Sequence, residues 1–413
     1  MNYKSFARWL ILTFWDKYYL MIYFFVLILL LFLSFRYDIN GKTKGREKWY
    51  IATLVILILL AGLRWRIGTD TPNYLRYFYH YYPTLGNFTF EEYPVGRDPF
   101  YVLINSIIKS VDGRFYMVQI IQATIVNTLI FKYFRKHCNY IFTCVLFYFL
   151  AGYISYSMEI MRASISIAIC LWGNDYILEK KWVKGYFLYV LALMFHSQTI
   201  VMFVLPVLFF LRLNKLGIVA MIVAFIMGYF IQSVFGEYLM LLDLEGTIAD
   251  KAENYIESER FGEQTRNINF VIVSILPNVI YGLIALYFLK KYNWEQRLLS
   301  LEPMIMIGLI FLMLQLNMQI AYRFVDYYRV YFIMYCAECF IHLTRQKRLS
   351  FGVSYFRAML LFLPFLFLSA YNRLDNRYHP YSSVIEKSIS KSREKRYNAN
   401  PNMQGRKANP DEY

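Results

Sequence analysis

Apolar runs long enough to cross a membrane recur along this 413-residue chain, from Tyr18 to Tyr371. A transmembrane helix needs about 20 predominantly apolar residues, because each residue advances the helix by only about 1.5 Å. The composition agrees, since 58% of the residues are apolar and 17% are charged, against roughly 45–50% and 25% in soluble domains. These patterns exclude a disordered chain, a disulfide scaffold and an ordinary soluble enzyme. They predict an all-α, polytopic membrane bundle.

Eleven runs are predicted to be transmembrane helices: residues 18–35, 49–65, 115–134, 139–157, 160–178, 186–211, 216–235, 268–289, 301–320, 326–344 and 355–371. The stretch 100–111 is apolar but too short to cross, so it is predicted to be re-entrant or interfacial. The run 186–211 is longer than a span needs and carries His196 inside it. It is predicted to be either one tilted helix or two half-helices that meet at the histidine. We expect one membrane domain over residues 1–371 and a basic, largely disordered tail over residues 372–413.

The formal net charge of +16 comes mostly from basic residues in short loops between the apolar runs. This is the positive-inside pattern, so the charge indicates membrane topology and not nucleic-acid binding. The basic loop 36–48 is predicted to be cytoplasmic, which places a large loop over residues 66–114 outside. The acidic loop 236–267 is also predicted to lie outside, whereas strict alternation of single spans puts it inside. The two statements agree only if the run 186–211 turns back on itself.

No metal or cofactor site is predicted. The five histidines are scattered, and no pair of aspartates has the spacing of metal ligands. Cys336 and Cys339 have CxxC spacing, but they lie within an apolar run without a second pair. Walker, GxGxxG, HExxH and GxSxG motifs are absent from the sequence, so ATP-driven transport and the common hydrolases are unsupported.

The first predicted external loop opens with a compact motif just after the second span: Arg66, Gly68, Asp70 and Tyr74. A basic and an acidic group fixed at a membrane surface could bind a phosphate and activate a hydroxyl. Between Arg66 and Asp98 the loop contains six tyrosines: Tyr74, Tyr77, Tyr79, Tyr81, Tyr82 and Tyr93. Tyrosine suits stacking on sugar rings and seating in the membrane interface equally well, so both interpretations stand.

Ionisable residues beside later spans are further candidates. Arg162 begins a span and could pair with Glu159 on the same helix face, or it could be a snorkelling anchor. His196 lies deep in an apolar run, where it is either a structural group or a proton acceptor. Between two spans, Arg323 and Arg329 could clamp a diphosphate. The alternative there is a structural arginine–aspartate pair with Asp326.

Taken in order, these motifs resemble the EpsG family of bacterial polysaccharide polymerases, relatives of the Wzy O-antigen polymerases. The first loop matches the family pattern Arg-x-Gly-x-Asp…Tyr. The later motifs match in the same order: Arg162 at the start of a helix, Phe195-His196 inside a span, and Arg323 followed by Tyr327 and Tyr328. Two positions depart from the usual pattern, Ala163 in place of glutamine and Gln198 in place of a small hydroxyl residue.

The resemblance implies a multi-pass protein of the bacterial inner membrane that transfers a growing undecaprenyl-diphosphate-linked glycan onto the next lipid-linked repeat unit outside the membrane. The diphosphate would be bound by four arginines: Arg66, Arg162, Arg323 and Arg329. Asp70 or His196 would be the general base, and Tyr74, Tyr77 and Tyr327 would line the sugar path. Arginines could stabilise a leaving diphosphate without a metal. Partners would be the lipid-linked oligosaccharide, membrane lipids and a chain-length regulator.

Three other functions fit the sequence. A membrane glycosyltransferase that adds one sugar from a polyprenyl phosphate donor would need the same acid and arginines. A flippase or exporter of lipid-linked oligosaccharide should instead line a central cavity with charge at mid-membrane depth. The charged residues of this chain cluster at span ends and only His196 is deep, which favours surface chemistry over transport. A structural subunit of a synthesis complex is the third.

Overall fold

A computed structural model describes residues 22–68, 70–90, 98–241, 271, 275–294, 296–317, 321–345 and 381–385, the side chains of residue 229 and residues 231–241 excepted. Within these residues the regular structure is helical, and the one β-bridge pairs Arg64 with Ser383. The predicted all-α class is therefore confirmed for the described part of the chain. The predicted span 355–371 and most of the predicted loop 236–267 lie outside the described residues.

The chain forms two compact units, and each is described by itself. The first draws on Met1–Lys136, Ile141–Val204 and Ala370–Tyr413. After the helix Ile22–Ile39, whose last turn is the π-helix η1 (Ser34–Ile39), its elements are α2 (Arg46–Gly62), α3 (Thr71–Arg76), η2 (Tyr77–Tyr81), η3 (Leu85–Asn87), α4 (Pro99–Ser110), α5 (Phe115–His137), α6 (Ile141–Tyr148), η4 (Phe149–Tyr153), η5 (Ser155–Glu159), α7 (Met161–Leu178), α8 (Trp182–Leu193) and η6 (Ser197–Phe203).

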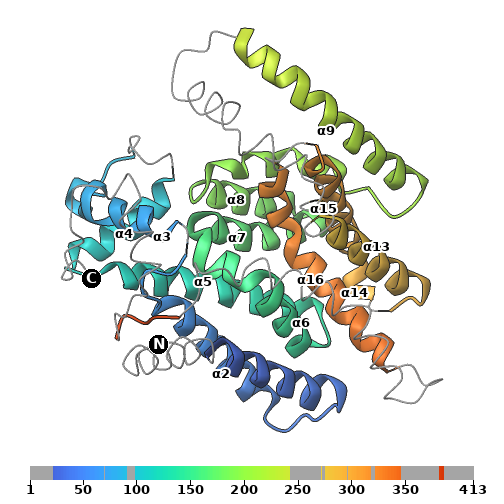
Figure 1. The fold of residues 1–413 in the computed structure, drawn as a ribbon, viewed down its shortest axis with the longest axis horizontal. Helices are drawn as coiled ribbons and strands as arrows, with labels where there is room; N and C mark the ends of the chain where they lie inside the picture. Colours follow the sequence, from blue (N-terminus) through green and yellow to red (C-terminus); the bar gives the residue numbers. More distant parts are fainter. Residues whose placement is uncertain are drawn as a thin grey trace, which may run out of the picture. The chain divides into compact units, whose positions relative to one another are not determined.

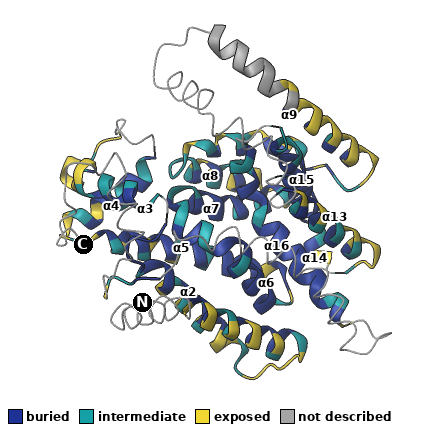
Figure 2. Ribbon diagram, in the orientation of Figure 1, coloured by how far each residue is buried: buried dark blue, intermediate teal, exposed yellow. Residues whose placement is uncertain are grey.

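The second unit draws on His137–Tyr140 and Leu205–Ser369. Its elements are η7 (Leu205–Leu208), α9 (Lys215–Leu241), α13 (Leu276–Lys291), α14 (Gln296–Leu299), α15 (Glu302–Gln315) and α16 (Tyr322–Thr344). In Figure 2, α7 of the first unit and α16 of the second are mostly buried, while α2 and the described part of α9 show exposed faces. The exposed residues on those two helices include Ile51, Val55, Leu59, Ile218, Ile222 and Phe225.

Two described helices are long and apolar enough to cross a membrane, Ile22–Ile39 and Phe115–His137. Shorter apolar helices cover Ile141–Tyr153, Trp182–Leu193, Lys215–Gly228 and Glu302–Gln315. These apolar helices indicate a membrane protein, because a soluble fold would not leave so many aliphatic side chains exposed on its helices. The number of eleven spans stays a prediction, as does the division into a membrane domain and a tail.

The predicted run 186–211 is a broken helix. Helix α8 ends at Leu193, and His196 is extended, with φ −158° and ψ 116°. The 3₁₀ turns of η6 follow directly. Of the two alternatives for this run, the half-helices that meet at the histidine are confirmed. His196 thus lies at the end of a helix, where its neighbouring backbone groups can bind partners other than the helix itself.

Helices α7 and α8 form an antiparallel hairpin with very close contact (Figure 1). A Cβ on Gly173 would lie 2.6 Å from Cε1 of Tyr189, and one on Gly185 would lie 2.5 Å from Cδ1 of Ile177. Small residues let helix backbones approach in this way. Because the two helices are antiparallel, the start of α7 and the end of α8 lie at the same end of the hairpin, and this juxtaposes Arg162 with His196.

In the second unit, α13, α15 and α16 pack around one aromatic ring. A Cβ on Gly282 would lie 2.4 Å from Cε1 of Phe332, and one on Gly308 would lie 2.5 Å from Cε2 of the same ring. Phe332 is 4% exposed. The two glycines therefore form the space that the ring fills between the helices.

We expect Gly308→Leu to destabilise the second unit by about 1–3 kcal/mol, because a larger side chain overpacks a closed core. Thermal unfolding in detergent measures the change. The control is Gly86→Leu, since a Cβ at Gly86 meets nothing within 4 Å. Equal unfolding temperatures for the two variants would contradict the packing described here.

Candidate functional site

The candidate site is built around the carboxylate of Asp98, which is 4% exposed. Its Oδ2 accepts a hydrogen bond from Nη1 of Arg162, and its Oδ1 accepts one from the backbone N–H of Ser197 at 3.0 Å. Nδ1 of His196 lies 3.9 Å from Oδ2. One acid thus joins the start of α4, the start of α7 and the segment after α8. The three segments are distant in sequence, since Asp98 and Arg162 are 64 residues apart.

Local sequence explains why Asp98 is available for these partners. It is the N-cap of α4 and precedes Pro99, a residue that begins helices readily because its missing N–H is not needed there. The Asp98 side chain makes no capping hydrogen bond to its own helix. The start of α4 is fixed instead by the N–H of Phe100, which donates to the carbonyl of Met194 at 3.0 Å. The Asp98 carboxylate is therefore directed to the segment after α8.

Charge and burial act in opposite directions on Asp98. Burial alone would raise the pKa of its carboxyl, but His196, Arg162 and the N–H of Ser197 together hold that pKa below its ordinary value of 3.8. The group is therefore a carboxylate throughout the neutral range. A carboxylate with a lowered pKa is a weak proton acceptor, but it orients and stabilises a neighbouring cation well.

Buried tyrosines line one side of this cluster. Tyr74 lies against Arg162, with 5.9 Å between the guanidinium Cζ and the ring centre. The ring of Tyr101 is 5.8 Å from that of Tyr74 and 6.5 Å from that of Tyr82. Burial raises the pKa of all three hydroxyls. They stay neutral, so they can donate or accept hydrogen bonds beside the arginine. Tyr77 extends the aromatic group, with its ring centre 6.2 Å from that of Tyr82.

The motif of the first loop is held against the π-helix η5. Gly68 has φ +109°, and a Cβ there would lie 2.8 Å from the carbonyl oxygen of Met158. Only glycine fits such a close approach without strain. The buried Arg64 reaches the same carbonyl, with Nη2 at 3.3 Å. Arg66 is 9% exposed and stacks on Trp65, while Asp70 is the N-cap of α3, the helix that carries Tyr74.

The last described residues of the chain pair with this loop. The N–H of Trp65 donates to the carbonyl of Ser382 at 2.8 Å, and the N–H of Val384 donates to that of Leu63 at 2.9 Å. The hydroxyl of Tyr381 donates to the carbonyl of Leu60 at 3.1 Å. These residues lie in the segment that the sequence predicts to be a tail, and here they secure the exit of α2.

The structure brings together three of the predicted site residues, Arg162, His196 and Tyr74. Arg66 and Asp70 lie on the loop that leads to Tyr74. Asp98, the acid at the centre, was not among the predicted site residues. The available signal was an acid directly before a proline at the start of a short apolar helix, which marks a helix N-cap but not its distant partners.

Arg323, Tyr327 and Arg329 belong to the second unit, so their part in the same site stays a prediction. Arg329 forms an ion pair with Asp326, with 2.5 Å between Nη2 and Oδ1. Of the two interpretations of this segment, the pair between Arg329 and Asp326 is the one observed. Tyr327 is buried in α16, and the guanidinium of Arg323 stacks on the ring of Tyr322.

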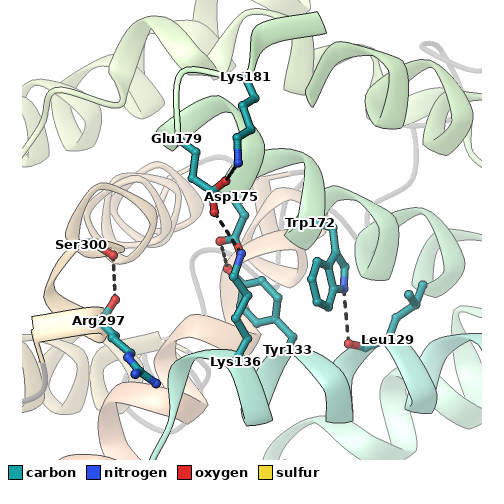
Figure 3. Close-up of polar contacts among 9 residues, drawn as sticks. All are labelled: Leu129, Tyr133, Lys136, Trp172, Asp175, Glu179, Lys181, Arg297 and Ser300. Atoms are coloured by element: carbon teal, nitrogen blue, oxygen red, sulfur yellow. Dashed lines mark hydrogen bonds and ion pairs between the residues drawn. The ribbon is translucent and has the colours of Figure 1, made fainter. Parts of the chain in front are cut away.

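A second polar cluster ties α5 to α7 at the end of the hairpin away from Asp98 (Figure 3). Lys136 bridges Asp175 and Glu179, with Nζ–O distances of 2.8 and 3.1 Å. The hydroxyl of Tyr133 donates to the other oxygen of Asp175 at 2.7 Å. Lys181 adds a further ion pair with Glu179 at 2.7 Å. Since every oxygen here faces a cation or hydroxyl of a neighbouring helix, we interpret the cluster as a structural clamp.

Comparison with protein-family models finds a match to the EpsG family over residues 47–383. The chain belongs to the EpsG family. The matched range includes Asp98, Arg162 and His196 together with every motif on which the resemblance depended, so that prediction is confirmed. No curated protein and no solved structure matches the chain. Membership of the EpsG family indicates a polysaccharide polymerase-type function and a lipid-linked sugar substrate.

We expect Asp98→Ala to lower the free energy of unfolding by about 3–5 kcal/mol, because it leaves a largely buried arginine without its carboxylate. Thermal unfolding of the purified protein measures this loss. The control is Glu47→Ala, which breaks an exposed ion pair with Arg135 whose side chains are 52% and 59% exposed. That change should cost less than about 1 kcal/mol.

A second variant of the same residue, Asp98→Asn, tests the pH dependence of stability. A carboxyl whose pKa is lowered on folding stabilises the folded state. This contribution is at its full size when the pH is above the pKa of the unfolded state, and it is lost as the pH falls through the pKa of the folded state. The difference in stability between the wild-type protein and Asp98→Asn should thus persist from neutral pH down to near 3.8 and shrink only below it. A difference that vanished between pH 7 and pH 5 would contradict the lowered pKa.

Proposed function

We propose that this EpsG-family protein is a polysaccharide polymerase that acts at the extracytoplasmic face of the bacterial inner membrane. It would transfer a growing glycan from undecaprenyl diphosphate onto the next lipid-linked repeat unit. The observation that supports this is the cluster of Asp98, Arg162 and His196, a basic group and a histidine assembled on one buried carboxylate.

The proposed reaction breaks one bond and forms one. A hydroxyl oxygen of the acceptor sugar attacks the anomeric carbon of the donor glycan. The bond from that carbon to the diphosphate breaks, and undecaprenyl diphosphate leaves with the electron pair. The hydroxyl proton passes to a base. No oxidant, reductant or nucleotide is needed. The leaving diphosphate is negatively charged, so cationic side chains beside its oxygens would stabilise it.

His196 suits the role of base better than Asp98 does. Its Nδ1 lies 3.9 Å from Oδ2 of the Asp98 carboxylate. A carboxylate behind a histidine stabilises the imidazolium that forms when the ring accepts a proton. Asp98 would thus be a positioning residue. Asp70, the alternative base, lies at the start of α3 on the same loop as Arg66.

Arg162 suits the diphosphate. Its side chain is 24% exposed, so it is held by protein on one side and reachable on the other. Arg66 would add charge from the first loop, and a role of Arg323 and Arg329 at the diphosphate stays a prediction from the sequence. Tyr74, Tyr77 and Tyr327 would contact the sugars through their ring faces and hydroxyls. Arginines that neutralise a diphosphate make a metal unnecessary for this step.

The test compares surface polysaccharide and lipid-linked intermediates from a deletion strain that carries His196→Ala, Arg162→Ala or the wild-type gene. We expect either variant to lose the polymer ladder and to accumulate a single lipid-linked repeat. Removing a general base should slow the transfer by about 10²–10⁴-fold. Arg135→Ala is the matched control, since Arg135 is a 59% exposed arginine near the C-terminal end of α5, where it pairs with Glu47 and not with the Asp98 cluster.

Protein level is measured in the same membranes, so that loss of protein is separated from loss of chemistry. A normal ladder from His196→Ala and Arg162→Ala at normal level would refute the proposal. A product shortened by a single sugar would indicate a one-step transferase, and a repeat confined to the cytoplasmic side would indicate a flippase. Either of these two results would also contradict the proposal that the protein is a polymerase.

A further inference from the structure

An apolar groove with a volume of about 510 Å³ lies in the first unit, beside the hairpin of α7 and α8. It is lined by Phe100, Ile125, Leu129, Ile165, Ile169, Trp172, Tyr176, Leu188, Leu191 and Phe195. Ligand sites commonly have volumes of roughly 300–1,000 Å³. Ile165 and Ile169 are buried and the other eight are half-buried, so the groove has a closed floor and accessible walls.

One face of α7 runs along the groove, and its buried residues Ile165 and Ile169 form the closed floor. Its residues Ile165, Ile169, Trp172 and Tyr176 follow one another at steps of four, three and four, the spacing of a single helical stripe. Arg162 lies on the same stripe, three residues before Ile165. From Arg162 to Tyr176 the helix rises by about 21 Å, at about 1.5 Å per residue. The groove is therefore long, and it begins one turn from the arginine.

Two aromatic residues connect the groove to the charged cluster. Phe100 follows Asp98 by two residues, and Phe195 directly precedes His196. Their rings meet edge to face, with 5.6 Å between the centroids. The polar cluster and the apolar groove thus share the segments that carry them. At the other end, Nε1 of Trp172 donates to the carbonyl of Leu129 at 3.4 Å, beside the clamp around Lys136 (Figure 3).

We propose that this groove binds the first part of the polyprenyl chain of a lipid-linked substrate, with the diphosphate at Arg162. The assignment rests on the proposed function for the headgroup, and it adds a site for the lipid. The groove offers the polyprenyl chain an apolar surface that runs along α7. Arg162 lies one helical turn before the first lining residue of α7, and its charge complements that of the diphosphate.

The closeness of charge and apolar wall favours this occupant over a bilayer phospholipid. In a polyprenyl diphosphate the first carbon of the chain is bonded directly to a phosphate oxygen. The apolar wall must then begin beside the cation, and here Ile165, Phe100 and Phe195 do so. In a phospholipid, a glycerol separates the phosphate from two acyl chains. Such a lipid would need a wider and more polar region between the arginine and the apolar wall.

The experiment uses a polyprenyl diphosphate without sugar that carries a diazirine on its chain. Irradiation of the purified protein in lipid nanodiscs labels the residues that contact the chain. We expect label on Trp172, Tyr176 and Leu191 that an excess of unlabelled polyprenyl diphosphate removes. A phospholipid with a diazirine in its acyl chain should label the exposed residues Phe187 and Val190 of α8 instead.

Substitutions on α8 provide matched variants. Leu188→Trp would fill the groove, whereas Val190→Trp lies on the outer face of the same helix, where Val190 is 47% exposed. We expect Leu188→Trp to weaken the apparent affinity for the probe by about tenfold, or about 1.4 kcal/mol, and Val190→Trp to leave it unchanged. Leu191→Trp serves as a second groove variant if Leu188→Trp unfolds early.

The outcomes separate this inference from the proposed function. Label in the groove that neither groove variant reduces would overturn the assignment, and so would equal groove label from the phospholipid. If the groove takes the polyprenyl probe while Arg162→Ala and His196→Ala still make polymer, the site for the chain stands, but the diphosphate position at Arg162 and the proposed chemistry both fail. If those variants lose polymer but the probe labels only outer residues, the chemistry stands and the groove assignment fails.

Discussion

The buried carboxylate of Asp98 is the interaction on which the arrangement of the first unit depends. A charge that is 4% exposed is costly unless partners surround it, and here each oxygen has one. The partners come from the start of α7 and from the segment after α8. Because the arginine and the backbone N–H both stabilise the same anion, the three segments hold one another in position. The cluster that we assign to chemistry is therefore also a structural junction.

The broken helix after α8 serves this junction. In a continuous helix over residues 186–211, the N–H of Ser197 would donate to a carbonyl of the preceding helical turn and could not bind Asp98. His196 would then lie in the middle of the helix. The break at Met194 frees that N–H for Asp98 and turns the imidazole toward the same carboxylate. An unwound segment is tolerated at membrane depth where protein surrounds its polar groups. The irregular backbone is thus compensated by the acid at the start of α4.

Hydropathy alone predicted most of the fold, because it depends on local composition. The predicted span 160–178 corresponds to α7 (Met161–Leu178), and 115–134 corresponds to most of α5 (Phe115–His137). The motifs predicted the family, and the structure places Arg162, His196 and Tyr74 around Asp98, while their roles stay a prediction. Asp98 could not be predicted in the same way, since its role depends on a partner 64 residues later. The motif includes Gly68, but the sequence does not give the reason for a glycine there, which is the close approach of the Met158 carbonyl oxygen in the folded chain.

The pairing of residues 381–385 with the exit of α2 also bears on how often the chain crosses the membrane. Backbone hydrogen bonds between Trp65 and Ser382 require both to lie on the same side of the bilayer. The chain must then cross an even number of times between them. Of the eleven predicted spans, two precede the first loop, and the nine that remain are an odd number. On the eleven-span prediction, one of these nine would therefore fail to cross, or would cross twice. Within the described residues, the run broken at His196 has a backbone that allows this, and an even number of crossings then agrees with the prediction that the acidic loop 236–267 lies outside.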